Sequence, residues 1–288
     1  MKKMSVSFLV FSLFTQIACA STGLFHGSTL KEVTLSESLQ GVRPGTVVVI
    51  GENHGFKTHQ NQQVAIMQQL RQQGLTVSVG MEFFYYPDQA HVDMWRDGMT
   101  SESDFLKLIN WGSPDFSYYR DQAQFPLKEE GGYTLALNAP RMITSAVAKK
   151  GIENLDPALK GLLPPDFKVG RDTYRQRFLK LMPHLPDAAA GERYFQAQSV
   201  WDDTMAWRAV EFMKQNPQHV LVIVVGEFHS QFGGGLQDRI RARGHQNILT
   251  FSQINSDGLS PQELSQEMAP SQQDGPRADF LWVDKAQP

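Results

Sequence analysis

Five titratable side chains in this chain directly follow apolar, Val- and Ile-rich segments, and their types suit acid–base chemistry or ligand binding. The motifs GENH, GME and GEFH supply them: Glu52, His54, Glu82, Glu227 and His229. Two copies of Gly-Glu-x-His, each after an apolar run, are much harder to obtain by chance than one. Because open α/β sheets bind ligands outside the carboxyl ends of their strands, we expect these side chains to converge on one rim. The alternative is structural: the acids accept backbone N–H bonds and the histidines cap helices.

Two histidines with two or three glutamates could hold a divalent metal, or one histidine could act as a base on water while a glutamate orients it. The motifs of two other kinds of hydrolase are missing from the sequence. The chain has no H-E-x-x-H motif, and Ser230 does not sit in a nucleophile elbow. The single cysteine, Cys19, lies near the N-terminus, so no thiol nucleophile, disulfide or cysteine-ligated zinc is expected.

The elements that must position these residues are short apolar runs without polar alternation, which are typical of strands buried on both faces of a parallel sheet. Between the first two runs, Thr58 to Gln73 has helical spacing and ends at Gly74, which predicts a βαβ unit. We therefore predict an α/β fold with an open, mostly parallel sheet flanked by helices. The expected strands are Thr46–Ile50, Thr76–Gly80, Thr134–Leu137, Val220–Val225 and Ile248–Phe251, with Phe280–Val283 as an edge strand.

Other segments predict smaller features around this sheet. Residues 87–110 read as two short helices, with Ser101 as a cap. A helix-rich insert, about 154–216, forms a smaller helical subdomain before the fourth main strand. The Ser-, Gln-, Pro- and Gly-rich tail, about 256–277, is expected to be loose.

The N-terminus predicts export. Lys2 and Lys3 precede a short apolar run and small residues, which together form a signal peptide over residues 1–20. Ala18-Cys19 resembles a lipobox, although Gln16 stands where that pattern has Leu, so Cys19 is expected to be lipidated. The alternative is cleavage before Ser21. The protein is thus expected to be an outer-membrane lipoprotein or a periplasmic protein, with no membrane-spanning segment after the signal.

Composition limits the function classes. With 288 residues, of which 41% are hydrophobic and 20% charged, the mature chain can form one large domain. The formal net charge of −3 gives no basic excess for nucleic acid binding.

Five motifs, in this order, resemble the ChaN-like haem-binding lipoproteins of the Tiki superfamily: GENHG, GMEFF, LNAPR, WDDTMAW and VVGEFHSQFGGG. The resemblance runs from about Val47 to Ile254. It implies a parallel sheet with a smaller helical domain, an exported protein of haem and iron uptake, and haem bound through a tyrosine at a dimer interface. It also implies an outer-membrane haem receptor as a partner and favours a binding protein over an enzyme. More distant superfamily members, such as Tiki proteases and erythromycin esterases, use the paired motifs for hydrolysis.

For haem, the protein must offer an axial ligand, partners for the propionates and an apolar wall. His54 and His229 are expected to contact propionates or to orient neighbours. The loop at Gly233 to Gly235 could receive an anion on free N–H groups. Trp201, Met205 and Trp207 could line a porphyrin, but core contacts are the better interpretation. The candidate axial ligands are Tyr174 and Tyr194 in the insert and Tyr85 and Tyr86 after the second strand, with Tyr118 and Tyr119 as alternatives.

Overall fold

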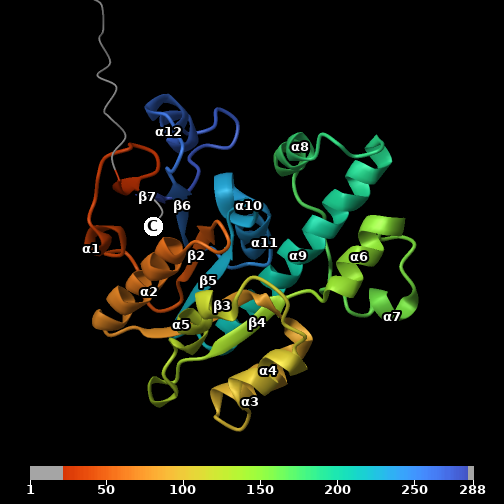
Figure 1. Cartoon of the computed structure of the whole chain (residues 1–288), viewed down its shortest axis with the longest axis horizontal. Coiled ribbons are helices and arrows are strands. Elements are labelled where there is room, and N and C mark those ends of the chain that lie inside the picture. Colours follow the sequence, from red (N-terminus) through yellow and green to blue (C-terminus); the bar gives the residue numbers. More distant parts are fainter. Residues whose placement is uncertain (1–21, 285–288) are drawn as a thin grey trace, which may run out of the picture.

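A seven-stranded sheet runs through the protein, and the computed structural model describes it within residues 22–284 (Figure 1). The strand order is β1-β7-β6-β2-β5-β3-β4, and every pair is parallel except β1 with β7. The predicted α/β fold class is therefore confirmed. The predicted signal peptide and Cys19 lie outside the described residues. The strands are β1 Gly23–His26, β2 Val47–Glu52, β3 Thr76–Tyr85, β4 Thr134–Asn138, β5 His219–Gly226, β6 Ile248–Asn255 and β7 Phe280–Asp284.

Two strands differ from their predictions in ways that affect the site. β3 continues to Tyr85 rather than stopping at Gly80, so Glu82 lies within the strand and not after it. β7 is not an edge strand, because β1 pairs with its outer side. Four residues form β1, which is too short a run to stand out in the sequence.

One face of the sheet is covered by helices from the first half of the chain. Apolar side chains of β2, β3 and β5 pack there against Ile66, Met67 and Leu70 and against an aromatic group that includes Trp95 and Phe105. Ser101 caps its helix by accepting from the N–H of Asp104, as predicted. The helices on this face are α2 Lys57–Gln72, α3 Gln89–Arg96, α4 Glu102–Leu108 and α5 Arg120–Gln124.

The opposite face is covered by α9 (Ala188–Gln215) and α11 (Gly235–Ala242). Met205 of α9 is fully buried between this helix and the sheet, so it is a core residue. Burying a side chain of this size contributes roughly 1.5 to 3 kcal/mol.

Beyond β4, the helices α6 (Arg141–Lys150), α7 (Pro157–Lys160), α8 (Asp172–Leu181) and the first half of α9 lie together on one side of the molecule (Figure 1). We call this group the helical insert. Ile143 and Val147 of α6 pack on Ala197 and Val200 of α9. Tyr174 and Phe178 of α8 pack on Phe195.

The tail that we expected to be loose contains a helix, α12 (Pro261–Met268). Ser260 accepts from the N–H of Glu263, and the Glu263 side chain accepts from the N–H of Ser260, which forms a capping box. Leu264 and Met268 pack against β6 and β7. No helix within residues 22–284 is long and apolar enough to cross a membrane. The remaining short elements are α1 Leu35–Ser38, α10 Glu227–Ser230 and the 3-10 helices Tyr86–Asp88, Phe116–Tyr118, Lys128–Glu130 and Gln231–Gly233.

Candidate functional site

The rim formed by β2, β3 and β5 holds four of the five titratable residues that we singled out. β2 and β3 both pair with β5, so their carboxyl ends lie side by side. β2 ends at Glu52, β3 carries Glu82, and β5 leads into the short helix α10, which carries His229.

His54 and Glu52 form a pair at this rim. His54 Nδ1 lies 3.0 Å from Glu52 Oε1, and 44% of the His54 side chain is exposed, whereas the Glu52 carboxylate is buried. Tyr119 donates to Glu52 Oε1 at 2.7 Å and Gln63 donates to Oε2 at 2.6 Å. The edge of the Phe83 ring packs on the imidazole. Burial would lower the pKa of His54, but its hydrogen bond to Glu52 and the charges of Glu82 and Glu52 raise that pKa overall. The pair therefore presents an oriented imidazole whose Nε2 has no hydrogen-bond partner among residues 22–284.

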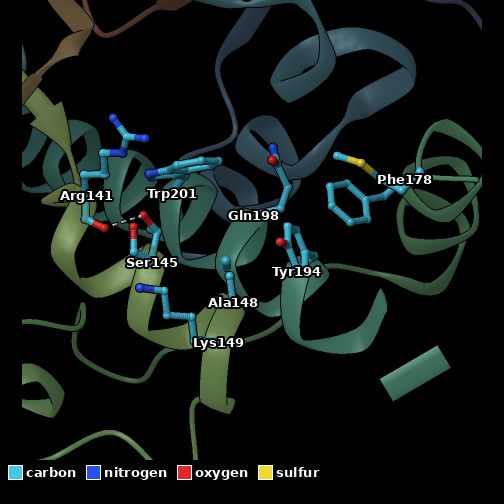
Figure 2. Close-up of a pocket in the computed structure, with 11 residues that line it drawn as sticks. Arg141, Ser145, Ala148, Lys149, Phe178, Tyr194, Gln198 and Trp201 are labelled. Carbon is cyan, nitrogen blue, oxygen red and sulfur yellow. Dashed lines mark hydrogen bonds between the residues drawn. The ribbon is translucent and has the colours of Figure 1, made fainter. Parts of the chain in front are cut away.

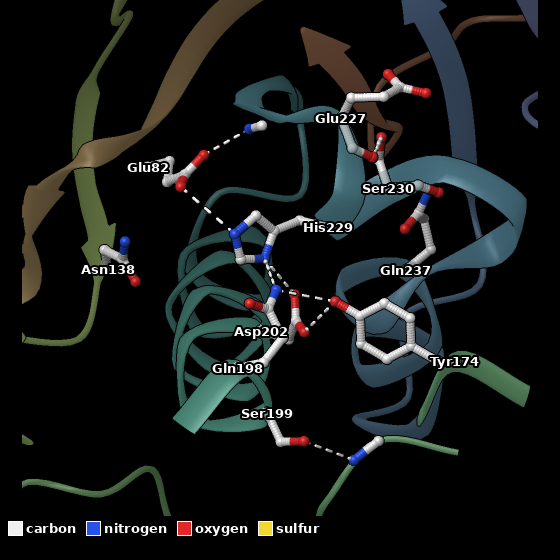
Figure 3. Close-up of polar contacts among 12 residues, drawn as sticks. Glu82, Asn138, Tyr174, Gln198, Ser199, Asp202, Glu227, His229, Ser230 and Gln237 are labelled. Carbon is white, nitrogen blue, oxygen red and sulfur yellow. Dashed lines mark hydrogen bonds and ion pairs between the residues drawn. The ribbon is translucent and has the colours of Figure 1, made fainter. Parts of the chain in front are cut away.

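His229 lies deeper, between two carboxylates (Figure 3). Its Nδ1 is 2.6 Å from Asp202 Oδ1 of α9, and its Nε2 is 3.5 Å from Glu82 Oε1. Burial would lower the pKa of His229, but the charges of Asp202 and Glu82 outweigh it and raise the pKa to about 10. Burial would raise the pKa of Glu82, but His229 and His54 hold it at about 2. These shifts favour an imidazolium at His229 beside an ionised Glu82, whereas burial raises the pKa of Asp202.

Gly226, the last residue of β5, allows the two histidines to share this rim. A Cβ at Gly226 would lie 2.9 Å from His54 Cε1 and 3.4 Å from Glu82 Oε2. The Gly226 N–H donates to Glu82 Oε2 at 2.5 Å. Any side chain at this position would thus displace the His54 ring, which explains the glycine in the second Gly-Glu-x-His motif.

Glu227 does not join this group. Its carboxylate points to the other side of α10, where Ser252 donates to Oε1 at 2.5 Å and Arg277 Nε donates to the same oxygen at 3.0 Å. Figure 3 shows Glu227 turned away from His229. Glu52, His54, Glu82 and His229 therefore lie together at one rim, as expected, whereas Glu227 ties α10 to β6 and to the tail.

A pH dependence of stability follows from His229. Because its pKa is raised in the folded state, its contribution is fully present below pH 6.5 and is lost as the pH rises towards about 10. We expect the free energy of unfolding, measured by urea denaturation, to fall between pH 6.5 and 10. In His229→Gln this decline should be much shallower. Equal slopes for the two proteins would show that His229 is neutral in the folded state.

The candidate tyrosines have different environments. Tyr174 is fully buried and donates to Asp202 Oδ2 at 2.9 Å, and burial raises its pKa well above the ordinary value. Tyr119 is also buried and donates to Glu52. Tyr86 donates to the carbonyl oxygen of Leu162 at 3.2 Å. Tyr194 is 43% exposed, and its hydroxyl has no hydrogen-bond partner within residues 22–284. Tyr85 is half-buried, beside the charge of Arg141.

A cavity of about 410 Å³ opens between α6, α8 and α9, and we call it the insert pocket (Figure 2). Phe178, Met182 and Trp201 give it apolar walls, and α6 contributes Arg141 from its first turn and Lys149 from its last. Tyr194 also lines it. The pocket adjoins the rim, because Trp201 packs its ring edge-on to His229, with ring centroids 6.2 Å apart. The full lining is Arg141, Thr144, Ser145, Ala148, Lys149, Phe178, Met182, Tyr194, Ala197, Gln198 and Trp201.

A smaller polar pocket of about 160 Å³ lies on the other side of Glu82. Phe83, Tyr85 and Asn138 line it, together with the loop after α4. Phe83 also contacts His54, so one side chain that lines this pocket touches that imidazole.

From the sequence, Asp202 could line the rim from the insert or be charged surface, and the structure places it on His229, whereas the whole of the insert pocket was missed. The available signal for Asp202 was an acidic pair within an otherwise apolar helix, in WDDTMAW. Asp202 faces His229, while its neighbour Asp203 pairs with Arg239 of α11 and with Arg243, which directly follows that helix. The pocket depends on how three helices meet, which no local pattern encodes.

The start of α11, whose N–H groups could receive an anion according to the sequence, packs closely on the protein's own Asp202 carboxylate. A Cβ on Gly235 would overlap the Asp202 carboxylate. Within residues 22–284, no group of three or more His, Cys, Asp or Glu side chains is arranged to hold a metal ion.

Comparisons with known proteins agree with this architecture. The family model described as "Haem-binding uptake, Tiki superfamily, ChaN" matches residues 39–240. No curated protein sequence matches the chain. The structure described as "Cofacial heme binding to ChaN of Campylobacter jejuni" superposes with a TM-score of 0.63 and 13% identity, over 90% of this chain and 95% of that chain. An erythromycin esterase mutant in its open conformation gives a TM-score of 0.49 with 12% identity, over 92% of this chain and 98% of the other. That score is too low to carry an argument.

Proposed function

Since this chain belongs to the ChaN family of haem-binding uptake proteins in the Tiki superfamily, we propose that it binds haem in the insert pocket for haem or iron uptake. The observation that carries this proposal is the pocket itself. It combines apolar walls, an accessible phenol and two cationic side chains beside the rim.

The residues of the insert pocket fit haem in size and chemistry. Its volume of about 410 Å³ lies within the range of roughly 300 to 1,000 Å³ that is usual for ligand pockets. Phe178, Met182 and Trp201 suit the macrocycle, and Arg141 and Lys149 suit the two propionates, which are carboxylates. An iron porphyrin bound here would supply a metal centre that accepts a phenolate donor.

Among the candidate tyrosines, Tyr194 has the environment that an axial ligand requires. It lines the pocket, and its hydroxyl is not committed to a protein partner within the described residues. Tyr174 and Tyr86 already use their hydroxyls in hydrogen bonds. We therefore assign the axial role to Tyr194, with Tyr85 as the next candidate. His229 is enclosed by Asp202 and Glu82 and acts as a structural neighbour of the pocket, not as a ligand.

An absorbance titration of the purified protein with haemin tests this proposal. We expect saturable binding with a high-spin, tyrosinate-type ferric spectrum, because one phenolate leaves the iron weakly ligated on its other face. Metal analysis of the same sample should find no stoichiometric metal in the protein before haemin is added. Haemin that remains unbound would contradict the proposal.

We further propose that the pocket lies at a homodimer interface. Large apolar side chains next to the lining residues are exposed, namely Met142 at 62% and Leu181 at 63%. Exposed apolar side chains around a pocket favour association. Sedimentation velocity with and without haemin tests this, and a monomer in both conditions would contradict it.

For localisation, we propose a lipid anchor at Cys19, in line with the lipobox-like sequence around this single cysteine. Mass spectrometry of the mature N-terminus should show a diacylated or triacylated Cys19. An unmodified chain that begins at Ser21 would instead establish a free periplasmic protein. An outer-membrane haem receptor stays our proposed partner.

A second candidate function is a hydrolase that uses histidine and glutamate, and the Glu52–His54 pair is the observation that favours it. His54 is oriented by the buried Glu52 carboxylate, and its Nε2 has no hydrogen-bond partner among residues 22–284, as a general base requires. In that case His54→Ala would abolish turnover of an ester or peptide substrate, and no tyrosine replacement would matter.

A further inference from the structure

The inner wall of the insert pocket is attached to the buried His229–Asp202 pair. Gln198 and Trp201 line the pocket on its sheet side, and both contact His229. The Gln198 amide nitrogen lies 3.0 Å from His229 Nδ1. Only one layer of side chains therefore separates the pocket from the imidazolium.

Helix α8, which forms a second wall, is attached to the same pair through Tyr174. Phe178 of α8 lines the pocket, and Tyr174 lies one turn earlier on the helix. The Tyr174 hydroxyl donates to Asp202 Oδ2 at 2.9 Å and accepts from Gln198 Nε2 at 2.9 Å. One carboxylate oxygen of Asp202 thus contacts His229 Nδ1, and the other accepts from the Tyr174 hydroxyl (Figure 3).

Close packing at Gly235 supports this arrangement. A Cβ at Gly235 would overlap the Asp202 carboxylate and would lie 2.7 Å from Tyr174 Cε1. Only glycine lets the start of α11 approach the Asp202–Tyr174 contact so closely, which explains the third glycine of FGGG. Buried hydrogen-bond networks of this kind are costly to leave partly unsatisfied.

From these contacts we propose that Tyr174 and Gln198 couple the insert pocket to the His229–Asp202 pair, with Tyr174 as a positioning residue for the α8 wall. A ligand that presses on Phe178 or Gln198 must then displace groups that touch the imidazolium. The inference rests on the proposed function, since it takes a porphyrin as the ligand of the pocket.

A second attachment of α8 provides the matched control. Arg171 and Arg177 pair with Asp274, and Arg177 also donates to the carbonyl oxygen of Gln231. These bonds hold α8 to the segment after α10 and to the tail at Asp274 without touching His229 or Asp202. Arg171→Gln therefore weakens the anchoring of α8 but leaves the proposed coupling in place.

The experiment uses gallium protoporphyrin, which is diamagnetic and leaves proton resonances visible. In the wild type we expect a downfield signal from the Nδ1 proton of His229, assigned by its loss in His229→Gln, because this proton lies in a short bond to Asp202. Adding gallium protoporphyrin should shift the signal. In Tyr174→Phe or Gln198→Leu the signal should differ before ligand is added, and the ligand-induced shift should shrink. In Arg171→Gln, the position of the signal before ligand is added and the ligand-induced shift should both match those of the wild type.

Haemin dissociation, measured with apomyoglobin as the acceptor, supplies the second readout. We expect Tyr174→Phe to release haemin about fivefold faster, the factor that one lost buried hydrogen bond gives, while the tyrosinate-type spectrum remains. If gallium protoporphyrin binds and the His229 signal does not move, the coupling is wrong and the proposed function stands. Loss of the tyrosinate-type spectrum in Tyr174→Phe would also overturn the positioning role. If the wild type takes up no porphyrin, the proposed function fails and the coupling fails with it.

Discussion

Replacing Tyr194 by Phe is expected to remove the tyrosinate-type ferric spectrum of the haemin complex and to weaken haemin binding. Tyr194 lines the insert pocket, is 43% exposed and keeps its hydroxyl free of described protein partners. The ring and its apolar contacts stay in Phe, so the fold should not change. Since the change removes a direct ligand, the loss of affinity should exceed the roughly 10- to 100-fold that removal of an outer-shell partner costs. Absorbance titration and haemin dissociation measure both effects.

The controls are Tyr85→Phe, Tyr86→Phe and Tyr174→Phe, each of which should keep the spectrum. If Tyr85→Phe alone removed it, the ligand would lie on the β3 side of Arg141 and our assignment would be wrong. If none of the four changes altered the spectrum, and metal were present in the purified protein, we would abandon haem transport in favour of hydrolysis.

The second large effect concerns stability: Asp202→Asn should lower the free energy of unfolding by about 3 kcal/mol or more. The substitution leaves His229 buried and charged with only Glu82, at 3.5 Å, as a counter-charge. Removing one partner of a buried ion pair typically costs about 3 to 5 kcal/mol. Tyr174 also loses its carboxylate acceptor. Chemical denaturation at pH 7 measures the change.

Asp121→Asn is the matched control. Asp121 pairs with Lys57, and both side chains are more than half exposed. Exposed pairs of this kind contribute roughly 0 to 1 kcal/mol, so the control should be close to the wild type. If Asp202→Asn were equally stable, His229 would not be charged in the folded state.

The sheet was predictable because its strands are apolar on both faces. Val47 to Ile50 and Val220 to Val225 are fully buried, and such runs without polar alternation are typical of strands buried on both faces of a parallel sheet. β1 was missed because four residues next to a turn carry no such pattern, and α12 because its capping box stands within a Ser- and Gln-rich segment.

The candidate site was predictable only in part. The rule that places polar residues after parallel strands correctly brought His54, Glu82 and His229 together. It could not give the direction of Glu227, because α10 starts at that residue and turns its side chain towards Arg277, fifty positions further along the chain. The partners of His229 and the lining of the insert pocket come from α6, α8 and α9, whose packing depends on tertiary contacts.

The position of β1 at one edge of the sheet affects how a membrane-anchored protein would be oriented. Four residue-to-residue steps separate Cys19 from the start of β1 at Gly23, a reach of at most about 14 Å. A lipid on Cys19 would therefore keep the β1 edge of the sheet close to the bilayer. β4, which leads into α6 and the insert pocket, forms the opposite edge, six strand spacings or roughly 29 Å away. The insert pocket would then lie about as far from the anchored edge as the sheet is wide.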